Sequence, residues 1–167
     1  MLNRKQRVTG LIILAVGVLV WLVVPFNSDG EHTDSDQAVY AVGRDYCLQL
    51  DVADTPAKKQ RGLSGRGRLE PNEGMLFPYE QSGRYGFWMK DMDFAIDIIW
   101  LDEDNRVVTI KERAHPRSYP QTFKPDQPAK KVIETPAGWT QKQNINSGDQ
   151  LTLVGPTTTT PVDCGSD

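Results

Sequence analysis

Residues 8–24, VTGLIILAVGVLVWLVV, contain no charged side chain and form the longest apolar run of the chain. As an α-helix, a segment of this length spans about 26 Å, close to the ~30 Å hydrocarbon core of a bilayer. No polar face interrupts the run, so it does not match a helix packed on the surface of a soluble domain. We therefore expect residues 1–26 to form a basic head followed by a transmembrane signal anchor.

The charges around this segment predict its orientation. Arg4, Lys5 and Arg7 precede it, whereas the first acidic residue of the chain is Asp29. Cytoplasmic flanks of membrane helices are rich in Lys and Arg, so we expect the N-terminus in the cytoplasm and the C-terminal domain outside. The alternative is a cleaved signal peptide and a secreted domain. The length of the run and the lack of a small-x-small cleavage motif favour the uncleaved anchor.

The remainder of the chain is acidic. The chain has 19 Lys and Arg and 22 Asp and Glu, so without the three basic residues of the head 16 basic residues remain against 22 acidic ones. The difference is a net charge of −6. Because phosphate binding needs a basic surface, this composition argues against nucleic acid as a partner.

The two cysteines, Cys47 and Cys164, suit an oxidising compartment. A disulfide between them would close a loop of over a hundred residues and stabilise the fold by up to ~4.7 kcal/mol on the entropic account. The alternative is two unrelated thiols. The histidines, His32 and His115, have no ligand-like spacing to either cysteine, so we expect no metal site and no cofactor.

Local composition divides the rest of the chain into three parts. Residues 27–37 are polar and acidic, which predicts a flexible spacer, and residues 156–167 form a low-complexity tail. The folded domain is therefore expected at residues 38–155. Within it, DTPAKKQRGL predicts a short helix at about 56–62, because Thr55 can cap it, Pro56 suits its first turn and Gly62 can end it.

Most of this domain is predicted to be β-structure. Apolar stretches of four to nine residues, several with alternating polar neighbours, are separated by turn residues. About seven such strands favour a mainly β domain, a small antiparallel barrel-like or sandwich fold with one or two short helices, with α+β as the alternative. The stretches lie near 46–52, 74–79, 87–90, 95–101, 106–114, 131–138 and 149–154.

The stretch FWMKDMDFAIDIIW, residues 87–100, places charges inside an apolar run. If residues 87–90 and 97–100 pair as a hairpin, Lys90 and Asp97 face each other near its loop. One interpretation is a semi-buried ion pair, joined by Arg61, that fixes the strand register. The other is the polar floor of a binding cleft.

Several short motifs occur in order along the folded part and together resemble the family called domain of unknown function 192. The resemblance covers roughly residues 45–155. It implies a compact, mostly β domain, often secreted or tethered to a membrane, and it implies no particular activity. The motifs are Arg61-Gly62-Leu63, Gly74-Met75-Leu76-Phe77, Phe87-Trp88-Met89-Lys90 and Ile96-Asp97.

These observations favour a module of the cell envelope that binds an unidentified small molecule or partner. Apolar and aromatic walls with few polar groups are typical of small-ligand sites. One alternative is an envelope hydrolase, acting on carbohydrate or peptide, that uses the Lys90 and Asp97 cluster, although no nucleophile with an adjacent base is visible. Another is a protein-interaction surface with Trp100, Trp139 and Phe123 as exposed anchors. The candidate ligand-binding residues are Arg61, Met75, Phe87, Trp88, Lys90 and Asp97.

Overall fold

The computed structural model describes residues 39–43 and 45–155. The predicted head and anchor, the spacer and the tail that contains Cys164 lie outside these residues. No helix in the described ranges is both long enough and apolar enough to cross a membrane.

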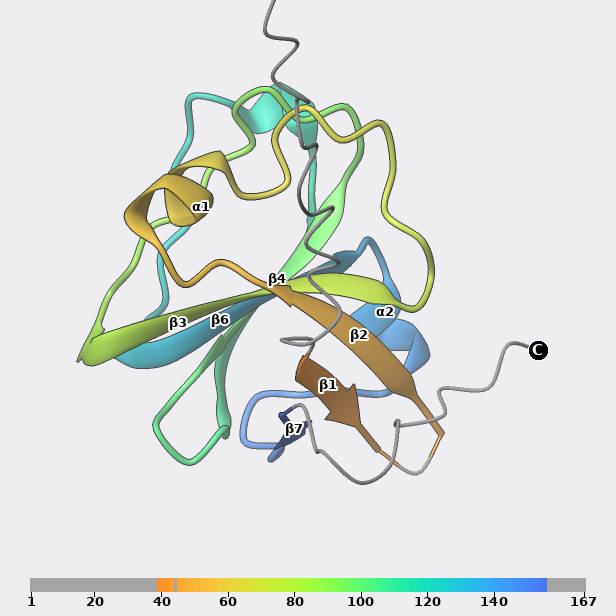
Figure 1. The fold of residues 1–167 in the computed structure, drawn as a ribbon, viewed down its shortest axis with the longest axis vertical. Helices are drawn as coiled ribbons and strands as arrows, with labels where there is room; N and C mark the ends of the chain where they lie inside the picture. The colour runs from red at the N-terminus through yellow and green to blue at the C-terminus, as the bar shows by residue number, and fades with distance from the viewer. Residues whose placement is uncertain (1–38, 44, 156–167) are drawn as a thin grey trace, which may run out of the picture. The chain divides into compact units, whose positions relative to one another are not determined.

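The described residues form one seven-stranded mixed sheet with short helices (Figure 1). The strand order is β5-β4-β6-β3-β2-β1-β7. The mainly β prediction is confirmed, but one strand pair is parallel and all the described strands belong to one sheet, so neither a wholly antiparallel fold nor a two-sheet sandwich forms. The strands are β1 Val39–Val42, β2 Cys47–Val52, β3 Glu73–Gly83, β4 Ile96–Leu101, β5 Val107–Ala114, β6 Ala129–Pro136 and β7 Thr152–Val154, and the helices are α1 Pro56–Arg61, the 3-10 turn η2 Pro116–Ser118 and α2 Trp139–Lys142.

The parallel pair is β2 and β3, in which Leu50 lies opposite Gly74. Parallel neighbours cannot be joined by a tight turn, so the chain must cross from the end of β2 back to the start of β3. Residues 53–72 make this connection, and α1 lies within it. The crossover therefore determines where α1 sits relative to the sheet.

The helix α1 forms for the local reasons that the sequence predicts. Thr55 adopts an extended conformation and its hydroxyl accepts a hydrogen bond from the Lys58 N–H at 3.2 Å. Pro56 occupies the first turn, where its missing N–H costs nothing. Gly62 ends the helix at a φ of 52°, a conformation that favours glycine.

The hairpin predicted between residues 87–90 and 97–100 does not form. All six residues of β4 are buried, and the strand pairs along both sides, with β5 and with β6. No edge of β4 is left for residues 87–90. Phe87 instead makes an isolated bridge to Phe123, which lies in the loop that follows η2.

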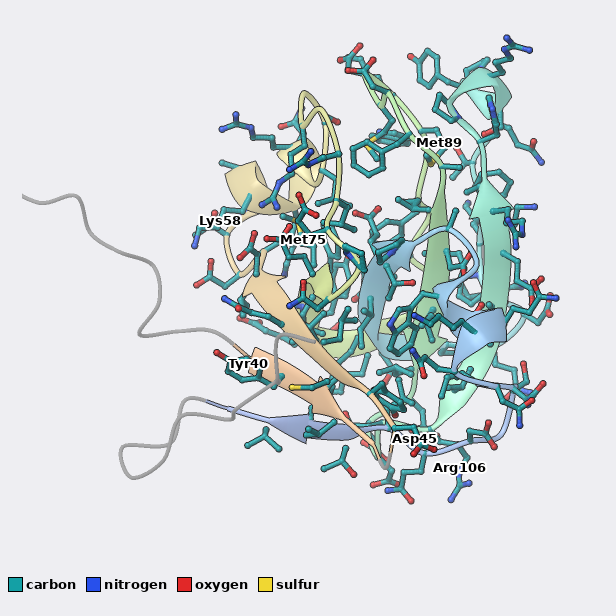
Figure 2. The ribbon with its side chains drawn as sticks, turned by 90° about the vertical axis from the view of Figure 1, so that its right-hand side faces the viewer. Tyr40, Asp45, Lys58, Met75, Met89 and Arg106 are labelled. Carbon is teal, nitrogen blue, oxygen red and sulfur yellow. The ribbon has the colours of Figure 1, made fainter. Side chains whose placement is uncertain are left out.

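The central strands are buried on both faces. In β4, Ile98 and Trp100 belong to one hydrophobic cluster, whereas Ile99 and Leu101 belong to a second. Successive side chains of a strand point to opposite faces, so the two clusters lie on opposite sides of the sheet. The first also contains Met75 and Met89, which Figure 2 shows among the packed side chains, while the second packs against Trp139 of α2.

The flanks of the two outermost strands are joined by backbone hydrogen bonds. The N–H of Val107 donates to the carbonyl of Asp149 at 2.8 Å, and Val107 in turn accepts from Gly148 at 2.8 Å. The N–H of Leu151 donates to the Asn105 carbonyl at 3.0 Å. The start of β5 is thereby attached to the segment that leads into β7.

Cys47 is the first residue of β2, opposite Val42 of β1, and it is not a free thiol. The other half of the predicted pair, Cys164, lies outside the described residues, so the disulfide stays a prediction.

Candidate functional site

Three hollows surround α1 and the loop that follows it. Their volumes are about 340, 450 and 380 Å³. Arg61 and Ser64 line all three, and Trp88 lines the first and the third. We call these three hollows together the α1 site, and the first of them, which also contains Phe87 and Glu134, the inner hollow.

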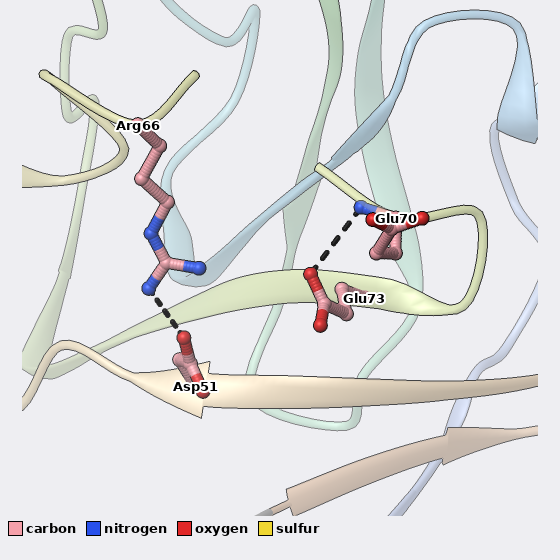
Figure 3. A network of polar contacts seen from close by, with 4 residues as sticks. All are labelled: Asp51, Arg66, Glu70 and Glu73. Carbon is pink, nitrogen blue, oxygen red and sulfur yellow. Dashed lines mark hydrogen bonds and ion pairs between the residues drawn. The ribbon is translucent and has the colours of Figure 1, made fainter. Parts of the chain in front are cut away.

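Polar contacts hold the loop after α1 in place. The hydroxyl of Ser64 donates to the Lys90 carbonyl at 2.9 Å, and the N–H of Gly65 donates to the Asp91 carbonyl at 3.0 Å. Arg66 forms an ion pair with Asp51 of β2 (Figure 3). These contacts fasten the loop both to the turn at residues 90–91 and to β2.

A further hydrogen bond holds the same loop at its junction with β3. The N–H of Glu70 donates to the Glu73 carboxylate at 3.2 Å, as Figure 3 shows at the entry to β3. Arg61 and Trp88, which are distant in sequence, border the same two of these hollows.

Trp88 is the exposed aromatic residue of the α1 site. Trp88 remains 48 % exposed, whereas its neighbour Phe87 is buried and packs edge to face against Phe77, with the ring centroids 4.9 Å apart. Large apolar side chains left open beside a hollow are common in ligand sites. Trp88 therefore offers a flat apolar surface at the mouth of the inner hollow.

Glu134 of β6 contributes a buried carboxyl group to the inner hollow. It is 5 % exposed and shares its sheet face with the cluster that contains Val132. Its Oε2 atom has no hydrogen-bond partner among the described residues. Burial raises the pKa of Glu134 to about 8, against an opposing effect of Arg66. The group is thus mainly neutral at pH 7 and can donate a hydrogen bond through its O–H.

A glycine lies close above this carboxyl group. A Cβ at Gly62 would lie 3.5 Å from Phe77 Cζ and 3.8 Å from Glu134 Oε2, both ordinary contact distances. Its positive φ, rather than the space around it, is what favours glycine here.

Two stacked tyrosines lie beside Glu134. The rings of Tyr79 and Tyr85 have centroids 3.4 Å apart, and the Lys59 ammonium lies 4.5 Å from the Tyr79 centroid. Burial, then Tyr85 and Glu134, raises the pKa of Tyr79 to about 12. Tyr79 is therefore neutral over the usual experimental range and can act as a hydrogen-bond donor.

Asp97 lies on the opposite face of the sheet from the α1 site. It shares its face with Ile99, next to α2, and is fully buried. Its Oδ1 accepts from the N–H groups of Arg113 at 2.8 Å and Gly138 at 3.0 Å. Its Oδ2 accepts from the N–H of Thr140 at 3.0 Å and from the Thr140 hydroxyl at 2.7 Å.

The ion pair predicted between Lys90 and Asp97 is therefore wrong. Lys90 is exposed, and its Nζ lies 4.0 Å from Asp91 Oδ2. Four donors from later segments of the chain satisfy the Asp97 carboxylate, so it needs no cation. This arrangement gives Asp97 a structural role, in which it holds the start of α2 and the end of β5.

The structure brings five of the six predicted ligand-binding residues to the α1 site. Arg61, Phe87 and Trp88 line the inner hollow, Met75 lines the second and Lys90 lines the third. Asp97 lines none of them. Lys59, Ser64, Tyr79 and Glu134 also line the inner hollow and were not predicted from the sequence.

Glu134 had a recognisable signal. It sits in the apolar stretch KVIETP just as Asp97 sits in AIDIIW. In both cases an acidic residue interrupts a strand that is otherwise expected to be buried.

The aromatic residues considered as anchors for a protein partner are mostly internal. Trp100 is fully buried and Trp139 is 6 % exposed, so neither can anchor a partner. Phe123 is half-buried against the first cluster. Among the described residues, no group of three or more His, Cys, Asp or Glu side chains is arranged to hold a metal ion.

Comparisons with known proteins give a consistent family assignment. The model of the family DUF192, described as "Uncharacterized ACR", matches residues 39–153. A UPF0127 protein of Thermococcus gammatolerans is 32 % identical over 111 residues, which cover 65 % of this chain and 69 % of that protein.

Two crystal structures resemble the fold described above. One is a candidate transcription regulator from Sinorhizobium meliloti, with a TM-score of 0.64 and 27 % identity over 71 % of this chain and 92 % of that chain. The other is a protein of unknown function from Novosphingobium aromaticivorans, with a TM-score of 0.63 and 27 % identity over 69 % of this chain and 83 % of that chain.

Proposed function

This chain belongs to the DUF192 family, and on that premise we propose that its folded domain binds a small molecule at the α1 site. The observation that carries the proposal is the pairing of an exposed apolar side chain with a buried polar one in the same hollow. Trp88 lies open at the mouth of the inner hollow, and Glu134 lies inside it with an unpartnered oxygen.

Both features are energetically unfavourable in the unbound domain. An exposed indole leaves apolar surface in water, and a buried oxygen without a hydrogen bond costs about 1–3 kcal/mol. A ligand that covers Trp88 and bonds to Glu134 would remove both costs. The volume of the inner hollow, about 340 Å³, is at the lower end of the range for small-ligand pockets.

We further propose that the domain works outside the cytoplasm, attached to the membrane by residues 8–24. The uncharged run and the preceding basic residues support this location. In intact spheroplasts, protease added outside should degrade the domain. Protection of the domain until the membrane is opened would contradict the proposed orientation, and release of the domain into the medium would favour the cleaved alternative.

A hydrolase that uses Lys90 and Asp97 is not proposed, because these two side chains lie on different parts of the fold and the Asp97 carboxylate already accepts four hydrogen bonds. The regulator description of the Sinorhizobium protein is not extended to this chain either. The chain outside its basic head carries the acidic charge balance given above, which does not favour nucleic acid.

Ligand binding can be tested with the full chain in mild detergent. Saturation-transfer NMR against a fragment library of sugars, amino acids, short peptides and aromatic acids should identify binders. Each binder should lose at least tenfold in affinity in Trp88→Ala. Tyr119→Ala is the matched control, because Tyr119 is equally exposed at 50 % but lines none of the three hollows. Equal affinities in the two variants would contradict the proposal.

A further inference from the structure

We propose that the ligand of the α1 site is a small organic anion, whose carboxylate or phosphate group pairs with Arg61 while its body lies between Trp88 and Glu134. This inference rests on the proposed function and names the chemistry of the ligand.

The charges around α1 are unequally compensated. Five basic side chains line the hollows, and three of them have an acidic neighbour. Lys58 pairs with Asp54 at 3.3 Å, Arg66 pairs with Asp51, and Lys90 lies 4.0 Å from Asp91.

The other two cations, Lys59 and Arg61, have no carboxylate within ion-pair distance in the described part of the chain. Both belong to α1, and both line the inner hollow. The one carboxyl group among the lining residues of this hollow, Glu134, is largely neutral at pH 7 because burial raises its pKa to about 8. The inner hollow therefore carries an uncompensated positive charge, which attracts an anion.

Arg61 is the better placed of the two cations. Lys59 lies against the Tyr79 ring, whereas Arg61 borders all three hollows, so a ligand in any of them is near it. A guanidinium group presents planar paired donors that match the two oxygens of a carboxylate or phosphate. Substitution of Arg61 should therefore weaken the binding of anions much more than the binding of neutral molecules of the same shape.

Glu134 supplies the second contact. Buried polar atoms are nearly always hydrogen-bonded, so an unpartnered Oε2 on the wall of a hollow points to a missing partner. As a neutral group it does not repel an anion, and its O–H can donate to a ligand oxygen. Trp88 completes the site with an apolar face for the body of the ligand.

Matched pairs of probes can test the charge preference. The pairs are D-glucuronate and D-glucose, D-glucose 6-phosphate and D-glucose, and benzoate and benzamide, titrated into the full chain by calorimetry at low salt. At least one anion should bind tenfold or more tightly than its neutral partner. The first two pairs distinguish a carboxylate from a phosphate, and the third tests whether a sugar ring is needed.

Two variants show where the preference comes from. Arg61→Gln should reduce the ratio of anion affinity to neutral-probe affinity to near one. Lys142→Gln is the control, because it removes an exposed cation of α2, which lines none of the hollows. A preference that survives in Arg61→Gln, or that disappears equally in Lys142→Gln, would overturn the proposal.

The outcomes separate this inference from the proposed function. If neutral probes or library fragments bind in a Trp88-dependent way and anions bind no better, the site binds ligands but the anion proposal is wrong. If no probe and no fragment binds, the proposed function itself fails and the anion proposal fails with it.

Discussion

Replacing Glu134 with glutamine should remove a pH dependence from the stability of the domain. The pKa of Glu134 is about 8 in the folded chain, compared with 4.5 for an ordinary glutamate. Between these values the folded state binds more protons than the unfolded state, so the free energy of unfolding falls as the pH rises. Below pH 4 the carboxyl group is protonated in both states and contributes no pH dependence.

The size of the effect follows from the shift. A difference of roughly 3.5 pKa units at 1.36 kcal/mol each gives about 5 kcal/mol, an upper bound because water that enters the hollow would stabilise the charged form. We expect the wild type to lose about 2–5 kcal/mol at this site between pH 4.5 and pH 8.5. The glutamine variant has nearly the same shape and no charge, so it should not show this loss.

Urea unfolding of the full chain, followed by circular dichroism at half-unit steps from pH 4.5 to pH 8.5, measures this difference. Glu134→Gln should match the wild type near pH 4.5 and be the more stable protein at pH 8.5. Glu80→Gln, which changes an exposed carboxyl group of the same sheet, should follow the wild type throughout. Parallel curves for wild type and Glu134→Gln would refute the reasoning.

Three further predictions concern the fold. Asp97→Asn puts an amide N–H₂ either where Thr140 now donates or where Arg113 and Gly138 donate. It should therefore lower the free energy of unfolding, measured in urea at pH 7, by about 3–5 kcal/mol. An unchanged midpoint would argue against the structural role of Asp97. Gly74→Ala should lower the free energy of unfolding by about 1–3 kcal/mol in the same assay, because the added Cβ would lie 2.7 Å from the Glu134 carbonyl oxygen; Gly67→Ala, where the added Cβ would meet nothing within 4 Å and the φ is likewise not positive, is the control. Thr55→Ala should cost about 1 kcal/mol through loss of the α1 cap and Thr55→Ser much less, and equal losses in both would place the effect elsewhere.

The sequence predicted local features well because their causes are local. Thr55, Pro56 and Gly62 lie within one turn of the ends of α1, and each acts through its own backbone or a near neighbour. The domain was expected to contain one or two short helices, and α2 is the second of them.

Strand pairing was predicted less well because it depends on distant segments. Residues 87–90 and 97–100 are close in sequence, which suggested a hairpin, but β5 and β6 pair with β4 instead. The helix between β2 and β3 was a usable signal for a parallel crossover, since such connections commonly carry a helix.

The candidate site shows the same contrast between features with local causes and features that depend on distant segments. Four aromatic and basic residues of the α1 site could be identified from the sequence motifs, namely Arg61, Phe87, Trp88 and Lys90, whereas Lys59 and Tyr79 were missed. The distinct roles of Asp97 and Glu134 could not be identified, because both are acidic residues in apolar strands. What separates them is a set of donors from Arg113, Gly138 and Thr140 that reaches Asp97 and has no counterpart at Glu134 Oε2.

Because β1 pairs with β7, the sheet does not depend on where along the strand order the chain begins and ends. Tyr40 lies opposite Val154 in an antiparallel register, so the two ends of the folded domain, at Val39 and Gly155, emerge side by side (Figure 1). Cα atoms of such partners are about 4.5–5.5 Å apart, a gap that a few residues can bridge. A circular permutant that joins these ends and opens the exposed turn at residues 103–104 would keep every strand pair of the sheet.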